Sequence, residues 1–431
     1  MSAPDLVAVA GFAALFLMML LRVPIGIAMA LVGVGGFAVI AGWSPALNLL
    51  ATSPVRTVTD YNLSLIPMFI LMGAFATASG MSGELFRAGH AWLGRFKGGL
   101  ALATIGACGG FAAICGSSVA TAATMSNIAL PQMRRFGYPD DLATGAIAAG
   151  GTLGILIPPS VVLAVYAFIT EQDVGQLFIA GIVPGLLALA MYMATVRLAY
   201  GRALPAGEPT LWTERLASLR GIWAVGLLFV AIIGGIYLGV VTPTEAAAAG
   251  AFLTGVIGVV RRRLGGAAIM ACLVDALRTS AAIFTILIGA LLFGYFLAIT
   301  QTPQKITGFL VALELGRYGT LALILALFVL LGCVLDAMAM IILLVPIVFP
   351  VIQTLGFDPI WFGVIVVITV ELGLITPPVG MNVFVINSIV PDTSLVGIFK
   401  GVAPFVLTDL VRLALLVAFP WLVLFLPRTM D

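Results

Sequence analysis

The chain is poor in the side chains that carry most enzyme chemistry. It has one histidine, His90, and four cysteines, which are scattered through apolar segments without paired spacing. No P-loop, zinc signature or dinucleotide fingerprint is present. These absences argue against a metalloenzyme, a thiol-based redox protein and an ATP-driven pump, so neither a cofactor nor an enzymatic activity is expected.

Charge is also scarce. Charged residues make up 9% of the chain and hydrophobic residues 62%, against about 25% and 45–50% in soluble proteins. The net charge of +2 indicates no nucleic-acid partner. Apolar runs such as 5–21, 24–42, 221–240 and 404–426 approach the ~20 residues that a helix needs to cross a bilayer. The composition therefore predicts an all-α polytopic membrane protein.

Prolines recur at a fixed distance along the chain. The positions that recur 219 residues later are Pro24, Pro131, Pro158 and Pro159, which become Pro243, Pro350, Pro377 and Pro378. With only 23 prolines in 431 residues, this match indicates an internal duplication. Matched Gly/Pro breaks in two halves of a membrane protein are typical of secondary transporters.

The basic residues predict how the chain crosses the membrane, because Lys and Arg favour the cytoplasmic side of short loops. The best agreement places the N-terminus outside. The expected spans are approximately 5–21, 24–42, 63–80, 142–170, 177–199, 221–240, 243–260, 280–299, 361–390 and 402–426.

Two further apolar stretches must enter and leave on one face. Residues 98–133 are predicted to form re-entrant hairpin 1, open to the cytoplasm, and residues 319–353 form its inverted copy, hairpin 2. The first inverted repeat covers 1–200, a cytoplasmic linker 201–220, and the second repeat 221–431. Each repeat then has about five transmembrane helices plus one hairpin. Segments 211–220 and 264–278 have the pattern of interfacial helices.

The spans 142–170 and 361–390 each contain Pro-Pro, which interrupts a helix. An interruption frees backbone carbonyls for a cation and exposes a helix N-terminus that suits a carboxylate. Because each break is matched by a polar hairpin tip, we expect two ion sites. The alternative is a pair of packing kinks.

The hairpin tips carry hard oxygen ligands. Hairpin 1 offers Gly116, Ser117 and Ser118, followed by Thr121 and Thr124; hairpin 2 offers Gly332, Val334 and Asp336. Asp336 aligns with Ser117 and is the one acid in its apolar stretch, which favours function over its alternative role as a loop cap.

Other polar residues near the breaks are candidates for a substrate cavity, together with Thr121 and Thr124: Ser126, Asn127, Asn382, Asn387 and Ser388. Glu371, which aligns with Thr152, either lines the pocket or is solvated. Asp409 and Arg412 are three residues apart and are expected to pair on one helix.

Four motifs resemble those of a known family, the large membrane subunit (DctM) of tripartite ATP-independent periplasmic (TRAP) transporters. They begin at Gly116 (GSSVATA), Gly154 (GILIPPS), Gly235 (GIYLG, leading to TPTEAA at Thr242) and Gly373 (GLITPPVG), and they occur in the family's order over nearly the whole chain.

The resemblance implies an elevator-type, sodium-driven importer of an organic acid such as a C4-dicarboxylate or a sugar acid. It implies a bacterial inner-membrane location, a small DctQ-like membrane subunit and a periplasmic DctP-like binding protein. It also implies two sodium sites: Gly116, Ser117 and Ser118 with Gly154 and Pro158, and Gly332, Val334 and Asp336 with Thr376, Pro377 and Met381.

Two other functions remain open from the residues alone. One is a stand-alone sodium/carboxylate symporter of the same broad fold, which would take up its substrate without a binding protein. The other, from a different class, is a membrane-embedded enzyme or assembly scaffold, against which the scarcity of histidine and paired cysteine argues.

Overall fold

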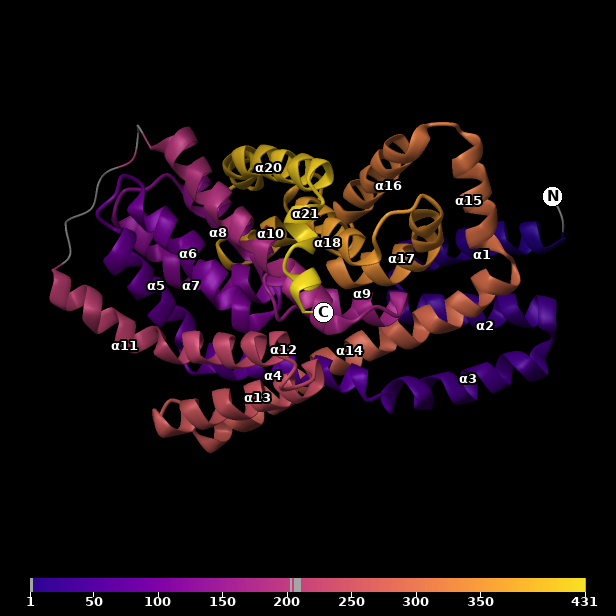
Figure 1. Cartoon of the computed structure of the whole chain (residues 1–431), viewed down its shortest axis with the longest axis horizontal. Helices are drawn as coiled ribbons and strands as arrows, with labels where there is room; N and C mark the ends of the chain where they lie inside the picture. The colour runs from indigo at the N-terminus through magenta and orange to yellow at the C-terminus, as the bar shows by residue number, and fades with distance from the viewer. Residues whose placement is uncertain (1–2, 202–203, 205–210, 431) are drawn as a thin grey trace.

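The computed structural model describes residues 3–201, 204 and 211–430, and within them the chain is helical without a β-strand. Figure 1 shows an elongated molecule in which helices from the two halves of the chain are interleaved. The predicted all-α polytopic class is confirmed. Of the predicted linker, residues 202–203 and 205–210 lie outside the described residues.

The first half runs from the N-terminus to a π-helical turn at Val196–Tyr200. Its helices are α1 (Ala3–Leu20), α2 (Ile25–Ala41), α3 (Trp43–Val58), α4 (Leu65–Ala78), α5 (Met81–Leu93), α6 (Gly99–Cys115), α7 (Ser118–Arg135), α8 (Asp140–Leu156), α9 (Val161–Thr170) and α10 (Val174–Thr195).

The second half repeats this order of long helix, hairpin and broken helix. It contains α11 (Trp212–Phe229), α12 (Gly235–Tyr237), α13 (Pro243–Val260), α14 (Gly266–Ile299), α15 (Thr302–Ala312), α16 (Gly316–Gly332), α17 (Ala337–Thr354), α18 (Pro359–Ile375), α19 (Met381–Ile389), α20 (Leu395–Ala418) and α21 (Trp421–Leu424).

Side-chain caps fix where several of these helices begin. Thr242 accepts a hydrogen bond from the Glu245 amide while the Glu245 carboxylate accepts one from the Thr242 amide, and Pro243 occupies the first turn. Asp173 caps α10 and Ser394 caps α20 in the same way. Such caps satisfy amides that have no partner inside the helix, and they end the loops sharply.

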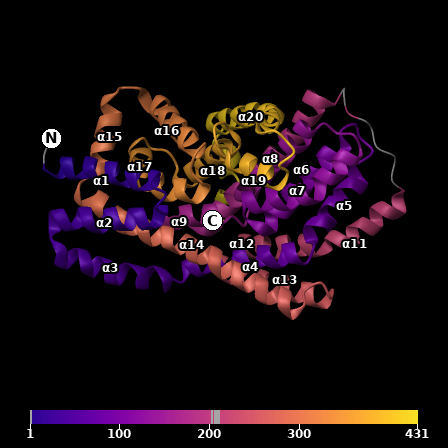
Figure 2. The ribbon, with the colours of Figure 1, turned by 180° about the vertical axis from the view of Figure 1, so that it is seen from behind.

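Packing between the halves is reciprocal. Helix α2 packs along α14, and its counterpart α13 packs along α4. Likewise α19 packs on α7, which Figure 2 shows from behind, while α9 packs on α17. In both views the hairpins α6–α7 and α16–α17 lie toward opposite ends of the molecule. Corresponding helices of the two halves thus have corresponding partners, and the inverted orientation of the two repeats stays a prediction.

Some boundaries differ from those predicted. Residues 212–220 and 266–278 are not separate interfacial helices, because each continues without a break into the following span as part of α11 or α14. The apolar–basic alternation in them marks only the first turns of long helices. Helices α3, α5 and α15 were not predicted, and α3 meets the segment 62–78 at a bend of 60°.

Six helices of the described chain are long and apolar enough to cross a membrane, and two bent pairs raise the number to eight. The ten predicted spans also included α1 and α2, which have 18 and 17 residues and lie near the lower limit for spanning. The core is a continuous cluster of buried aliphatic and aromatic side chains centred on α8, α10, α17 and α18.

Candidate ion and substrate site

The tip of hairpin 1 is a tight turn between α6 and α7. Gly116 has a φ of 63°, a conformation that favours glycine. Ser117 caps α7, because its hydroxyl accepts a hydrogen bond from the Ala120 amide at 3.3 Å. The Thr121 hydroxyl donates to the Ser117 carbonyl at 2.7 Å. The turn thus gathers hydroxyl and carbonyl oxygens within a few residues.

The first helix break receives this tip directly. A methyl group added to Gly154 would lie 2.5 Å from the Ser117 carbonyl oxygen, and one added to Gly116 would lie 2.9 Å from the Pro159 carbonyl oxygen. Beyond the break, Ser160 caps α9 through the Leu163 amide. Tip and break are therefore in van der Waals contact, and glycine makes the approach possible.

The tip of hairpin 2 uses an acid where hairpin 1 uses a serine. Asp336 caps α17 by accepting a hydrogen bond from the Ala339 amide at 2.8 Å. Its side chain is exposed, as is Val334, whereas Gly332 is buried. The capping role that the sequence left as an alternative is present, and an ion-binding role for the same carboxylate stays a prediction.

The second break closes on hairpin 2 in the same way. A methyl group on Gly373 would lie 2.7 Å from backbone atoms of Gly332. The Gly380 amide donates a hydrogen bond to the Cys333 carbonyl at 3.2 Å. The Thr376 hydroxyl donates to the Leu372 carbonyl at 2.6 Å. Both predicted pairs of tip and break are brought together.

The two sites differ in accessibility. Gly154, Pro158 and Ser118 are buried, whereas Pro377 is exposed and Met381 is half-buried. Within the described residues no group of three or more His, Cys, Asp or Glu side chains could hold a metal. The oxygen donors at the tips are backbone carbonyls, hydroxyls and one carboxylate, a set that suits an alkali cation rather than a transition metal.

One predicted substrate residue joins the two halves. Asn382 of α19 is buried and donates to the Ser118 hydroxyl at 2.7 Å and to the Ala148 carbonyl at 3.3 Å. It therefore links the second broken helix to the tip of hairpin 1. The sequence did not predict this contact, because the two residues lie 264 positions apart.

The other substrate candidates bond locally. Ser126 and Asn127 donate to carbonyls one turn earlier in α7, Ser388 donates to the Val385 carbonyl, and Asn387 donates to the Thr393 carbonyl. Asn127 and Ser388 are exposed, and Thr124 is half-buried. A role for these four residues in a substrate cavity stays a prediction.

A buried polar network joins the C-terminal halves of α8, α10, α18 and α20. Arg412 pairs with Glu371 at 2.6 Å and with Asp409 at 3.0 Å, and all three side chains are fully buried. The predicted Asp409–Arg412 pair is confirmed. Glu371 is buried rather than solvated. Its partner Arg412 lies on another helix, and no local sequence pattern marks this contact.

Arg134 connects hairpin 1 to the second half at the membrane surface. Its guanidinium bonds both carboxylate oxygens of Asp140 at 2.8 Å and pairs with Asp392 at 2.9 Å. The hydrogen bonds that Arg134 donates to Asp140, and then to Asp392, raise the pKa of Arg134 further above its ordinary value. The side chain therefore stays charged and holds three chain segments together.

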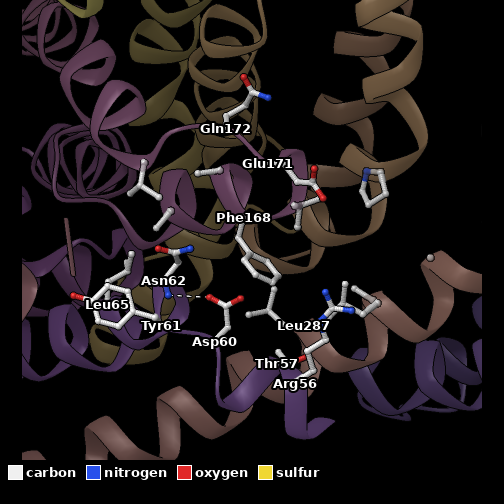
Figure 3. A pocket seen from close by; sticks show the side chains of 18 of the residues that line it. Arg56, Thr57, Asp60, Tyr61, Asn62, Leu65, Phe168, Glu171, Gln172 and Leu287 are labelled. Atoms are coloured by element: carbon white, nitrogen blue, oxygen red, sulfur yellow. Dashed lines mark hydrogen bonds between the residues drawn. The ribbon is translucent and has the colours of Figure 1, made fainter. Parts of the chain in front are cut away.

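A separate cavity of about 1170 Å³ lies between the α3–α4 bend, the α9–α10 turn and α14. Figure 3 shows Phe168 and Leu287 lying between Glu171 and Arg56 in this cavity, with Asp60 accepting a hydrogen bond from the Asn62 amide. It is distinct from the hairpin tips and was not predicted, because its lining comes from five separate parts of the chain.

A known protein family and several known proteins match this chain over most of its length. The family described as the DctM component of tripartite ATP-independent periplasmic transporters matches residues 12–422. The chain is 39% identical to the C4-dicarboxylate TRAP transporter large permease protein DctM of Pseudomonas aeruginosa, covering 92% of this chain and 93% of the relative.

Two further proteins extend the comparison. The chain is 35% identical to the isethionate TRAP transporter permease protein DctMQ of Oleidesulfovibrio alaskensis, covering 88% of this chain but 60% of that longer relative. The crystal structure of the YdaH transporter of Alcanivorax borkumensis has a similar fold, with a TM-score of 0.64, 17% identity and coverage of 88% of this chain and 90% of YdaH.

Proposed function

We propose that this chain, which belongs to the DctM family of tripartite ATP-independent periplasmic transporters, is the large permease subunit of a sodium-driven importer of an organic acid. The observation that carries the proposal is the contact of each hairpin tip with the helix break of its own half. A cation held between them would be bound only while tip and break are closed. Binding of the ion would therefore favour one conformation.

The residues present suit sodium. At the first site the Ser117 and Ser118 hydroxyls and the carbonyls around Gly116, Gly154 and Pro158 would hold the ion. At the second site Gly332, Val334, Thr376, Pro377 and Met381 would contribute backbone oxygens, the Thr376 hydroxyl would add another, and Asp336 would supply negative charge. These ligands are all hard oxygen donors, and together they carry at most one negative charge. Such ligands suit a hard cation of low charge.

The substrate is proposed to be an organic acid. The names of two relatives specify a C4-dicarboxylate and isethionate, both organic anions. Polar side chains of α7 and α19 near the tips, with Asn382 at their contact, would supply hydrogen bonds to it. In the predicted threading, the cavity at Asp60 and Glu171 opens to the periplasm and would be the outer access to the moving region.

Partners are proposed on the same basis. This chain covers 60% of the DctMQ relative, and the proposed complex includes a small DctQ-like membrane subunit. A periplasmic DctP-like protein would deliver the substrate to a permease in the bacterial inner membrane, with the N-terminus of the large subunit periplasmic. The hairpins and broken helices of the two repeats would move as an elevator against the helices α2, α4, α13 and α14.

Reconstitution tests this function against the stand-alone symporter. The chain is placed in proteoliposomes with its small subunit, and substrate uptake is measured with and without the binding protein under an inward sodium gradient. We expect uptake only when the loaded binding protein is added. Uptake of free substrate by the chain alone would contradict the tripartite function and favour the symporter.

A further inference from the structure

The buried network of α18 and α20 contains more acid than base. Glu371, Asp409 and Arg412 have no exposed surface. If both carboxyls were ionised, the single guanidinium would leave a net charge of −1 in the protein interior. An uncompensated buried charge costs several kcal/mol, and a membrane offers it no solvent.

The surrounding described elements supply no second cation to the network: Lys400 of α20 is exposed and lies twelve residues before Arg412. Helix α8 presents Thr152 to the network and α10 presents Tyr192. Helices α17 and α19 and the short α21 contain no ionisable residue. In α16, Arg317 lies in the first turn and bonds the Gly356 carbonyl, and Tyr166 of α9 bonds the Pro359 carbonyl at the far end of α18.

We propose that the network binds one proton and that Glu371 carries it. A proton makes the enclosed set electrically neutral without any further ligand: one protonated carboxyl, one carboxylate and one guanidinium. The site is then a resident proton-binding site between α18 and α20, separate from the two hairpin tips.

Hydrogen bonding assigns the proton to Glu371 rather than to Asp409. Both Asp409 oxygens lie 2.8 Å from the Tyr192 hydroxyl, which donates to this carboxylate, and one of them also forms an ion pair with Arg412 at 3.0 Å. Glu371 accepts from Arg412 alone, and its Oε1 has no partner. Donors aimed at a carboxylate favour its charged form, so Asp409 is the acid that stays ionised.

The matching positions of the first half of the chain carry neutral side chains. The counterpart of Glu371 in the first half is Thr152, 219 residues earlier, and the counterpart of Arg412 is Tyr192, 220 residues earlier. The hydroxyls of Thr152 and Tyr192 lie 3.2 Å apart, at positions equivalent to the Glu371–Arg412 ion pair. The first half thus has a neutral pair where the second has charges, and Asp409 adds an acid where the first half has Leu189.

Infrared spectroscopy of the full-length chain in lipid tests the proposal, because a protonated carboxyl has a C=O stretching band separate from the carboxylate bands. At neutral pH we expect one such band, equivalent to one carboxyl per chain, which disappears in Glu371→Gln. Isotopic labelling of glutamate carboxyl carbons should shift the band. The matched control is Glu84→Gln, since Glu84 is also buried but pairs with Arg261 and Arg263, and it should leave the band unchanged.

Two results would overturn the proposal. One is a wild-type spectrum without the band at neutral pH; the other is a band that glutamate labelling does not shift. If Glu371→Gln fails to fold, the wild-type protein still decides the question. Its band should then fade as pH rises, and a spectrum with no acid band between neutral and alkaline pH would contradict the resident proton.

Discussion

At the scale of single residues, glycines set how closely each hairpin tip approaches its helix break. Gly154 and Gly116 leave no room for a methyl group against Ser117 and Pro159. Gly373 and Gly332 do the same in the second half. The oxygens that would bind a cation are mostly backbone carbonyls, so their positions depend on these backbone contacts more than on any one side chain.

Substitution of Gly154 tests this dependence. In Gly154→Ala the new methyl would meet the Ser117 carbonyl oxygen at 2.5 Å, and overpacking of this kind costs about 1–3 kcal/mol. We expect an inserted protein whose sodium-dependent uptake falls at least tenfold. The control is Gly35→Ala, also within a helix, where nothing lies within 4 Å of the added methyl. Equal uptake by the two variants would refute the close-contact role.

Asp336 permits its charge to be separated from its capping role. Asn caps a helix about as well as Asp does, so Asp336→Asn should keep the bond to the Ala339 amide and lose only the negative charge. We expect normal melting behaviour with weaker apparent sodium affinity. Asp336→Ala should lower both the melting temperature and the apparent sodium affinity. If Asp336→Asn transports with unchanged sodium dependence, the carboxylate is only a cap.

At the scale of elements, the sequence predicted the hairpins and broken helices well because prolines and glycines break helices locally. The pairs α6–α7, α8–α9, α16–α17 and α18–α19 all follow such breaks. Helix ends marked by charge alone were placed wrongly, since α11 and α14 continue through their basic segments. Contacts such as Asn382 with Ser118, or Glu371 with Arg412, depend on tertiary packing that no local pattern encodes.

Arg134 shows how one contact couples elements. It joins the end of α7 to the start of α8 and to Asp392 before α20. Arg134→Gln should lower the melting temperature by an amount corresponding to about 1 kcal/mol or less, because the pairs are partly exposed and screened. Arg135→Gln, an exposed neighbour, is the control. If both variants change the melting temperature equally, the ion pairs of Arg134 add no stability beyond that of an exposed arginine.

At the scale of the whole molecule, α2 packs on α14 as α13 packs on α4, so corresponding helices of the two halves have corresponding partners. The predicted threading then places both ends of hairpin 1 inside and both ends of hairpin 2 outside. Single cysteines near Arg95 and Arg135 should resist an impermeant thiol reagent added outside, and cysteines near Arg317 and Asp358 should react. Unequal labelling of the two ends of one hairpin would contradict the inverted repeats.

The central claim, that closure of tip on break couples sodium to uptake, is tested most directly by ion replacement. Substrate uptake is measured in proteoliposomes that contain the chain and its partners, with sodium varied and no pH gradient imposed. We predict that uptake rises sigmoidally with sodium, because the proposal includes two similar sodium sites. We also predict that Ser117→Ala/Ser118→Ala lowers the Hill coefficient or abolishes activity. Uptake that continues unchanged when potassium replaces sodium would contradict the account.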